Sequence, residues 1–376
     1  MDIELRWLPS GQSGLAAMAR LIESAEHNIQ LQTYIYRDDR VGLHLRELLV
    51  AAARRGVRVR ILVDALGSFS LGADFFAMLE EAGGELRVFN PLHPRRFIYR
   101  NHRKLLVCDR KRAVVGGFNV AEEYDGDGVD DGWLDLGMAL KGDLAEALAA
   151  AFDRLFVLAG QRPRRFARWR SSGERRAIKT SQGQLLLSGP GRSANPLKAG
   201  LMRDLGRAEQ VRIVSPYFLP SWSMRRRLMK LARQGGQVQL LLPGKSDVAL
   251  ARHASRSIYA RLIRAGVEVL EYQPQILHAK LVLTDKAVYV GSANFNTRSF
   301  NIDYELMLRL NDDRVLAQAN GLFEHYASQS RRIDLDELRR LGGLWTRIRQ
   351  RFAYFMMARL DPLVAGWLWR HWRYPE

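Results

Sequence analysis

One short motif occurs twice in the chain. Its first copy is H-R-K-L-L-V-C-D at residues 102–109, and its second is H-A-K-L-V-L-T-D at residues 278–285. A neighbouring segment, R-R-G-V-R-V-R-I-L-V-D at 54–64, also returns in the same order as R-Q-G-G-Q-V-Q-L-L-L-P at 233–243. Solenoid units recur every ~20–50 residues, so a repeat of this length predicts two duplicated domains instead.

Helical and strand-like patterns alternate within each half. Residues 43–55, L-H-L-R-E-L-L-V-A-A-A-R-R, have helical spacing, and residues 57–64, V-R-V-R-I-L-V-D, are rich in β-branched residues and alternate as a strand does. This alternation predicts the α/β class, in which strands are joined through helices. With 376 residues, the chain is long enough for two such lobes and a further segment.

The expected boundaries follow from the repeat and from composition. We assign the first lobe to 1–160, a basic interlobe linker to 161–182, the second lobe to 183–330 and a C-terminal segment to 331–376. The stretch 162–179 contains eight basic residues and one acid, Glu174. Such a stretch is either a solvated linker or a seam that faces an anion.

Charge and cysteine content restrict the partners and the compartment. The chain has 58 Lys and Arg against 40 Asp and Glu, a net charge of +18, which favours polyanions such as nucleic acid or anionic lipid headgroups. The single cysteine, Cys108, cannot form an intrachain disulfide, which favours the cytoplasm. Neither a signal peptide nor an apolar run of about 18 residues is evident, so secretion and membrane spanning are not expected.

The histidine and lysine of each motif are expected to act together. Residues two apart in a strand point to the same face, so His102 projects with Lys104 and His278 projects with Lys280. An imidazole beside a fixed cation suits a phosphate group. We therefore assign these four side chains to catalysis.

Each motif ends in an aspartate, Asp109 or Asp285. As members of the motif, both are included in the candidate catalytic set. Their parity along the strand is opposite to that of the histidines, and turn-like residues come after them, so a structural role is favoured for both.

A corner of small residues comes after each motif, G-G-F-N in the first half and G-S-A-N in the second. Glycine lets a backbone approach a ligand closely, and the side chains of Asn119, Asn294 and Ser292 could donate hydrogen bonds to phosphate oxygens. A downstream acid completes each set. Asp135 and Glu305 are the candidates for orienting a histidine and stabilising its charged form.

These motifs resemble those of the phospholipase D superfamily, whose signature is the duplicated motif with G-G/S-x-N. Within the superfamily the chain is most similar to bacterial cardiolipin synthases, particularly the type without N-terminal membrane spans. The details that match are N-H-R-K at 101–104, E-E-Y at 122–124, W-x-D at 133–135 and R-S at 298–299.

The resemblance implies one active site, where the two motifs meet on a pseudo-twofold axis between mixed β-sheets flanked by helices. His102 would attack the phosphorus of phosphatidylglycerol while His278 protonates the departing glycerol, and a second phosphatidylglycerol would then take the phosphatidyl group. The lysines and asparagines would stabilise the non-bridging oxygens in place of a metal. No metal, cofactor or obligatory nucleic acid is expected, and the active unit is expected to be a monomer.

Other activities remain open. A phosphodiesterase or nuclease of the same superfamily would use the same chemistry, and water, glycerol or phosphatidylethanolamine could replace phosphatidylglycerol as acceptor. The chain has Asn296 where the synthases usually have Asp, and Asp303 where they usually have Asn, so the acceptor is not fixed by the resemblance. A catalytically inactive scaffold is disfavoured because both His-Lys-Asn sets are present.

Aromatic residues and arginines are interspersed in the segment 331–376. Four of the eight tryptophans lie here, and arginines interrupt every apolar run. Interfacial helices combine these features, so we expect peripheral docking on the cytoplasmic face of a membrane. The alternative is a helical pair that packs on the lobes. The tryptophans and the interrupting arginines are Trp345, Trp367, Trp369 and Trp372, and Arg347, Arg349, Arg351, Arg359, Arg370 and Arg373.

Overall fold

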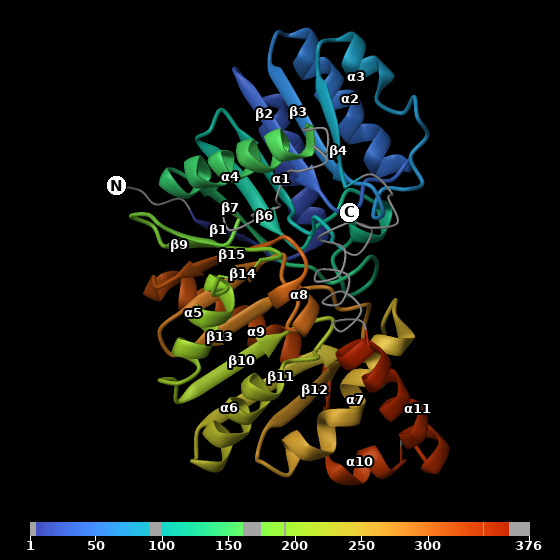
Figure 1. Ribbon diagram of the computed structural model, residues 1–376, viewed down its shortest axis with the longest axis vertical. Coiled ribbons are helices and arrows are strands. Elements are labelled where there is room, and N and C mark those ends of the chain that lie inside the picture. The colour runs from blue at the N-terminus through green and yellow to red at the C-terminus, as the bar shows by residue number, and fades with distance from the viewer. Residues whose placement is uncertain (1–4, 91–98, 161–173, 192, 341, 361–376) are drawn as a thin grey trace, which may run out of the picture.

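The computed structural model describes residues 5–90, 99–160, 174–191, 193–340 and 342–360. These residues form two lobes, each built on a mixed β-sheet with helices packed against it (Figure 1). The predicted α/β class and the division into two lobes are therefore confirmed.

The first lobe contains a seven-stranded sheet. Its elements are β1 (Arg6–Leu8), α1 (Gly11–Glu23), β2 (Asn28–Thr33), α2 (Arg40–Arg54), β3 (Arg58–Asp64), α3 (Ala77–Glu81), β4 (Glu85–Phe89), β5 (Leu105–Cys108), β6 (Arg112–Gly116), η1 (Glu122–Tyr124), β7 (Gly137–Lys141) and α4 (Asp143–Gly160). Strands β2, β3 and β4 are parallel and are joined through α2 and α3. Strand β5 pairs with β2 in the antiparallel sense and begins the hairpin β5–β6.

The second lobe contains a nine-stranded sheet. Its elements are β8 (Arg176–Lys179), β9 (Gln184–Ser188), α5 (Pro196–Asp204), β10 (Gln210–Val214), α6 (Trp222–Arg233), β11 (Gln237–Pro243), α7 (Ala249–Ile263), β12 (Glu268–Tyr272), β13 (Leu281–Thr284), β14 (Val288–Gly291), α8 (Thr297–Asn301), β15 (Glu305–Leu310), α9 (Asp313–Ser328) and β16 (Ser330–Ile333). Three elements come after this sheet: α10 (Leu335–Arg340), α11 (Leu344–Phe355) and η3 (Met356–Leu360).

The strand orders of the two sheets match. The first sheet has the order β4-β3-β2-β5-β6-β7-β1, and the second has β12-β11-β10-β13-β14-β15-β9, with β16 and β8 added at its edges. The parallel pairs β2–β3 and β10–β11 therefore occupy equivalent places, as do the motif strands β5 and β13. This correspondence is the structural form of the sequence repeat.

A single apolar cluster extends through both lobes. It includes Met138 in β7, Phe152 in α4, Leu283 in β13 and Phe323 in α9, all of them buried. The buried residues of α4 recur at helical spacing along one face of the helix. Burial of a side chain as large as Phe152 contributes about 3 kcal/mol, so this shared core holds the lobes in a fixed relation.

Two of the expected boundaries fall inside the second sheet. Strand β8 lies within the stretch assigned to the linker, where it pairs with β9, and strand β16 crosses the boundary at 330/331, where it pairs with β12. Glu174, the acid of the basic stretch, forms an ion pair of 3.2 Å with the fully buried Arg103. The rest of the expected linker, residues 161–173, lies outside the described residues.

Helix α11 has two different faces. One face packs against α7, where Ala353 is buried together with Leu219 and Ala254. The other face carries a stripe of exposed apolar side chains at helical spacing, namely Trp345, Ile348, Phe352 and Phe355. The remaining tryptophans of the C-terminal segment lie outside the described residues. No helix within the described ranges is both long enough and apolar enough to cross a lipid bilayer.

Candidate active site

The two motif histidines lie at the edges where the sheets meet. His102 and His278 lie just before β5 and β13, which run antiparallel to β2 and β10. Each histidine therefore lies at the C-terminal edge of the parallel strands of its own lobe. The backbone N–H of His102 donates to Tyr304 O at 2.9 Å, and that of His278 donates to Leu134 O at 2.7 Å. These equivalent bonds between the lobes place both histidines at one interface.

Each imidazole is held by an acid from the opposite lobe. His102 Nδ1 lies 3.0 Å from both carboxylate oxygens of Glu305, and His278 Nδ1 lies 2.6 Å from Asp135 Oδ2. The order of the motifs predicts each acid beside the histidine of its own half, and the structure exchanges them. Because Nδ1 is engaged by a carboxylate in both cases, Nε2 is the nitrogen left for chemistry.

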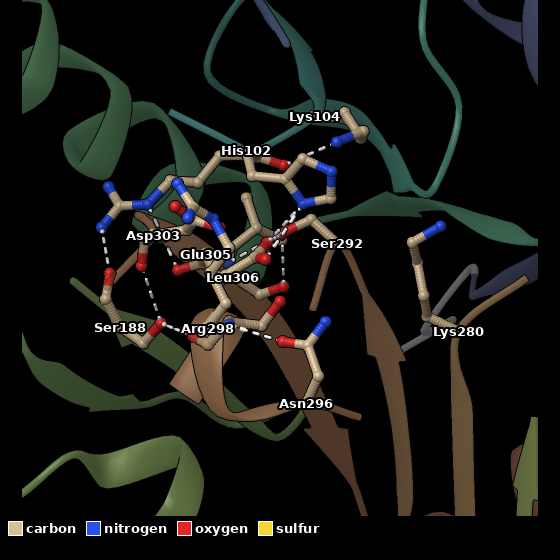
Figure 2. Close-up of polar contacts among 12 residues, drawn as sticks. His102, Lys104, Ser188, Lys280, Ser292, Asn296, Arg298, Asp303, Glu305 and Leu306 are labelled. Atoms are coloured by element: carbon tan, nitrogen blue, oxygen red, sulfur yellow. Dashed lines mark hydrogen bonds and ion pairs between the residues drawn. The ribbon is translucent and has the colours of Figure 1, made fainter. Parts of the chain in front are cut away.

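The motif lysines lie beside the histidines, as the strand parity predicted. Lys104 Nζ donates to the backbone carbonyl of His102 at 2.8 Å, and Lys280 Nζ donates to that of His278. Lys280 Nζ also lies 2.8 Å from His278 Nδ1, which cannot donate to Asp135 and accept from Lys280 at once. Because the contact to Asp135 is the shorter of the two, we assign the proton to Nδ1 of His278. Figure 2 shows the two lysines with His102 and Glu305 in one region of the interface.

Burial and positive charge shift the pKa values of this cluster. Burial lowers the pKa of Lys104 to about 7 and that of Lys280 to about 8. Burial and the neighbouring lysine charges lower the pKa of His278 to about 4 and hold that of His102 well below its usual value. Burial raises the pKa of Glu305 to about 7. Both imidazoles are therefore neutral near pH 7, and an anion that offsets the lysine charges would raise their pKa values.

The small-residue corners hold other side chains in place. Ser292 Oγ donates to Glu305 Oε2 at 2.5 Å, so this hydroxyl positions the acid that holds His102. Asn119 donates to Tyr124 Oη at 2.6 Å and accepts a backbone N–H from the segment after β2. Asn294 is buried, and its Oδ1 has no hydrogen-bond partner within the described part of the chain.

The motif aspartates lie away from this cluster, at the far ends of the motif strands. The Asp109 carboxylate accepts backbone N–H groups from residues 26–28 at the start of β2 and pairs with Arg112 at 3.0 Å. The Asp285 carboxylate accepts two backbone N–H groups, from residues 209 and 210, at 2.7 and 2.8 Å. The structure therefore does not bring either aspartate to the histidines.

Aromatic rings enclose both histidines, and the motifs predict no functional role for these rings. The Tyr34 ring lies edge-on to His102, with centroids 5.1 Å apart, and Lys104 Nζ lies 5.4 Å from the centre of the same ring. His278 contacts Tyr124 at 5.1 Å and Trp133 at 5.6 Å between centroids. In the sequence, Tyr124 and Trp133 are marked by the motifs E-E-Y and W-x-D, whereas no motif marks Tyr34.

The fold and the site together define a duplicated α/β protein of the phospholipase D type, with one histidine–lysine pair from each lobe. The chain belongs to the family described as "Cardiolipin synthase, PLD-like domain", whose model matches residues 18–127 and 201–327. The resemblance drawn from the motifs is therefore confirmed.

Individual relatives agree with this assignment. The chain is 34% identical over 343 residues to the major cardiolipin synthase ClsA of Bacillus subtilis, covering 88% of this chain and 70% of that protein. It is 30% identical over 370 residues to cardiolipin synthase 1 of Bacillus cereus, covering 95% and 72%. Among solved structures, phosphatidylserine synthase of Haemophilus influenzae has the same fold, with a TM-score of 0.75, 16% identity and coverage of 96% and 95%.

The contacts of Asp109 lead to a test of its role. Because its carboxylate binds several backbone N–H groups, Asp109→Ala should lower the free energy of unfolding by about 2 kcal/mol. Turnover per folded molecule should not change. Urea unfolding and activity of the same preparation measure both quantities, and Asp38→Ala, at an exposed position, is the control for lost charge. A loss of turnover at unchanged stability would instead give Asp109 a chemical role.

Proposed function

We propose that the chain is a phosphatidyltransferase of the cardiolipin synthase type, which converts two phosphatidylglycerol molecules into cardiolipin and glycerol. One observation carries the proposal: two histidines lie at one interface, and each has the lysine of its own motif and an acid from the opposite lobe beside it. The relatives named cardiolipin synthase give the substrate class, membrane phospholipids.

In the first step, His102 Nε2 attacks the phosphorus of phosphatidylglycerol. A nitrogen–phosphorus bond forms, the bond from phosphorus to the glycerol oxygen breaks, and that oxygen takes a proton from His278 Nε2. The low pKa of His102 keeps this imidazole neutral and therefore nucleophilic. The anionic phosphodiester offsets the lysine charges, so that His278 can carry the proton it must give.

In the second step, the chemistry runs in reverse with a new alcohol. A hydroxyl of a second phosphatidylglycerol attacks the phosphorus, its proton passes to His278 Nε2, and the bond from phosphorus to His102 breaks. Cardiolipin is released and His278 regains its proton. Since the same imidazole acts first as acid and then as base, no net proton is consumed.

Charge on the non-bridging oxygens would be stabilised by Lys104, Lys280 and the amide of Asn294. Preorganised donors in a site that excludes water stabilise a transition state more than the same groups do in water. Asn119 and Ser292, also candidates for phosphate binding by their sequence position, would act by holding Tyr124 and Glu305. Within the described residues, no group of three His, Cys, Asp or Glu side chains is placed to hold a metal ion.

The roles of the histidines give a direct test of the function. In bacteria that lack cardiolipin, expression of the wild-type chain should restore it, and His102→Ala or His278→Ala should each reduce its formation by roughly a thousandfold or more, as expected when nucleophile or acid is lost. Lipid mass spectrometry measures the product. Phosphatidic acid as the main product would identify a hydrolase instead.

A second experiment identifies which histidine forms the covalent intermediate. Rapid quenching with labelled phosphatidylglycerol, followed by peptide mapping, should place the acid-labile adduct on His102. An adduct on His278 would reverse the two roles. Half the wild-type activity in either single variant would contradict a shared site.

The lysine pKa values predict the pH dependence. In the free enzyme Lys104 loses its charge as pH rises through its pKa of about 7, and Lys280 does so as pH rises through its pKa of about 8. A phosphodiester anion is held by the charged forms, so kcat/KM should fall as pH rises through about 7 and further as it rises through about 8. Initial rates on mixed micelles of fixed composition, measured from mildly acidic to strongly alkaline pH, give this profile. A value of kcat/KM that stays constant through the alkaline range would exclude the lysines as the cationic ligands.

We place the protein on the cytoplasmic face of a membrane, as a peripheral enzyme. Of the twelve large apolar side chains exposed on the described residues, four lie in α11 and five lie in segments after the C-terminal ends of β3, β10 and β11. The histidines lie at the C-terminal edges of these parallel strands. The nine apolar side chains are Leu66, Phe69, Trp222, Val248, Leu250, Trp345, Ile348, Phe352 and Phe355.

Positive charge accompanies this apolar surface. The guanidinium of Arg226 lies 5.1 Å from the ring centre of Trp222, and Arg347, Arg349 and Arg351 are exposed on α11. Aromatic side chains that enter the interface, flanked by arginines that meet anionic headgroups, are typical of peripheral membrane proteins. This arrangement supports docking with the active site turned toward the lipid.

The α11 stripe can be tested without removing the helix, whose other face covers Leu219 and Ala254. Replacing the four stripe residues by Ser should weaken binding to phosphatidylglycerol liposomes roughly tenfold or more, because each side chain contributes about 1.5–3 kcal/mol of burial. Sedimentation measures binding. The control is Met78→Ser with Val157→Ser, at exposed positions of α3 and α4. Equal binding by the stripe variant and the control would leave α11 with a packing role alone.

A further inference from the structure

Arg100 lies two residues before His102 in the chain and has no part in the mechanism described so far. Residues 100–102 pair with Tyr304 of the other lobe in a parallel β-bridge centred on Asn101. Since side chains alternate in a bridged segment, Arg100 projects to the same side as His102. Positions two apart are separated by about 6–7 Å in extended backbone.

The guanidinium of Arg100 is buried with most of its hydrogen-bonding capacity unused. The residue is only 3% exposed, and Nη1 lies 3.5 Å from Asp64 Oδ1. Nε and Nη2 have no hydrogen-bond partner within the part of the chain that the structure describes. Asp64 also accepts the backbone N–H of Asn101 at 2.8 Å and that of Leu66 at 2.9 Å. A buried guanidinium with unpaired N–H donors can bind an anion.

The equivalent position in the second lobe is apolar. Tyr304 N donates to Arg100 O at 2.9 Å, and Leu134 N donates to Ile276 O at 2.9 Å, so the two backbones match. Ile276 therefore stands where a symmetric site would have a second arginine. The extra cation lies on the His102 side only, whereas a single phosphate held between the two histidines would need no such asymmetry.

We propose that Arg100 binds the phosphate of the acceptor lipid. This inference rests on the proposed function, in which an acceptor phosphatidylglycerol attacks the phosphatidyl group on His102. One glycerol joins the two phosphates of the product, so three carbons and two oxygens separate the phosphorus atoms. That length is similar to the spacing of residues 100 and 102 along extended backbone. Arg100 would thus hold the acceptor phosphate while the far hydroxyl of its glycerol reaches the phosphorus on His102.

Water-soluble acceptors test this role apart from membrane docking. With phosphatidylglycerol as donor, labelled glycerol and labelled glycerophosphate compete for the phosphatidyl group, and only the second carries a phosphate. The wild-type enzyme should prefer glycerophosphate. Arg100→Gln should reduce that preference about tenfold or more, as expected for the loss of charge-assisted hydrogen bonds, and Arg100→Lys should retain part of it. Arg58→Gln, which removes an exposed arginine paired with Glu85, is the control and should leave the preference unchanged.

Each outcome bears on the inference. A wild-type enzyme that uses both acceptors equally would overturn it, and so would an Arg100→Gln variant whose rates fall equally with both acceptors. The wild-type comparison stands even if the variant does not fold. Failure of the proposed function is distinct, because the wild-type chain would then transfer phosphatidyl groups to neither acceptor.

Discussion

The exchange of acids between the lobes is the interaction on which the site depends. Glu305 of the second lobe holds His102 of the first, and Asp135 of the first lobe holds His278 of the second. All four side chains are largely buried, and removing one member of such a pair leaves an uncompensated polar group at a cost of several kcal/mol. The pairs form only when the lobes are docked, and the shared apolar core supplies that docking. Neither half-site is complete within its own lobe.

The same burial prepares the site for an anion. Burial lowers the pKa values of the two lysines and the two histidines because the charged forms lose hydration, and for Lys104 and both histidines repulsion from a neighbouring lysine lowers them further. A phosphodiester brings a compensating negative charge, so binding and protonation are coupled. In the proposed mechanism, a bound phosphate would therefore favour the charged lysines and the protonated form of His278.

Repetition and strand parity made part of this molecule predictable from its sequence. The two lobes, the α/β class, and the placement of Lys104 beside His102 are all consequences of local patterns. Strand parity also favours a structural role for Asp109, although its place in the motif made it a candidate catalytic residue. The exchange of acids could not be predicted, because it depends on how one lobe rotates onto the other. Hydrogen-bond partners could not be predicted from the sequence either. The sequence is equally consistent with a Ser292 that faces a phosphate, and only the fold directs its hydroxyl to Glu305.

A symmetric framework still has to perform an asymmetric reaction, and the structure shows where the symmetry is broken. The equivalent acids differ, Glu305 against Asp135, and the aromatic neighbours differ as well. Tyr34 lies against His102, whereas two rings, those of Tyr124 and Trp133, enclose His278 more tightly. A nucleophile needs an open approach to phosphorus, and a proton donor needs a fixed orientation. The less enclosed histidine therefore suits the covalent role, and the more enclosed one suits the transfer of protons.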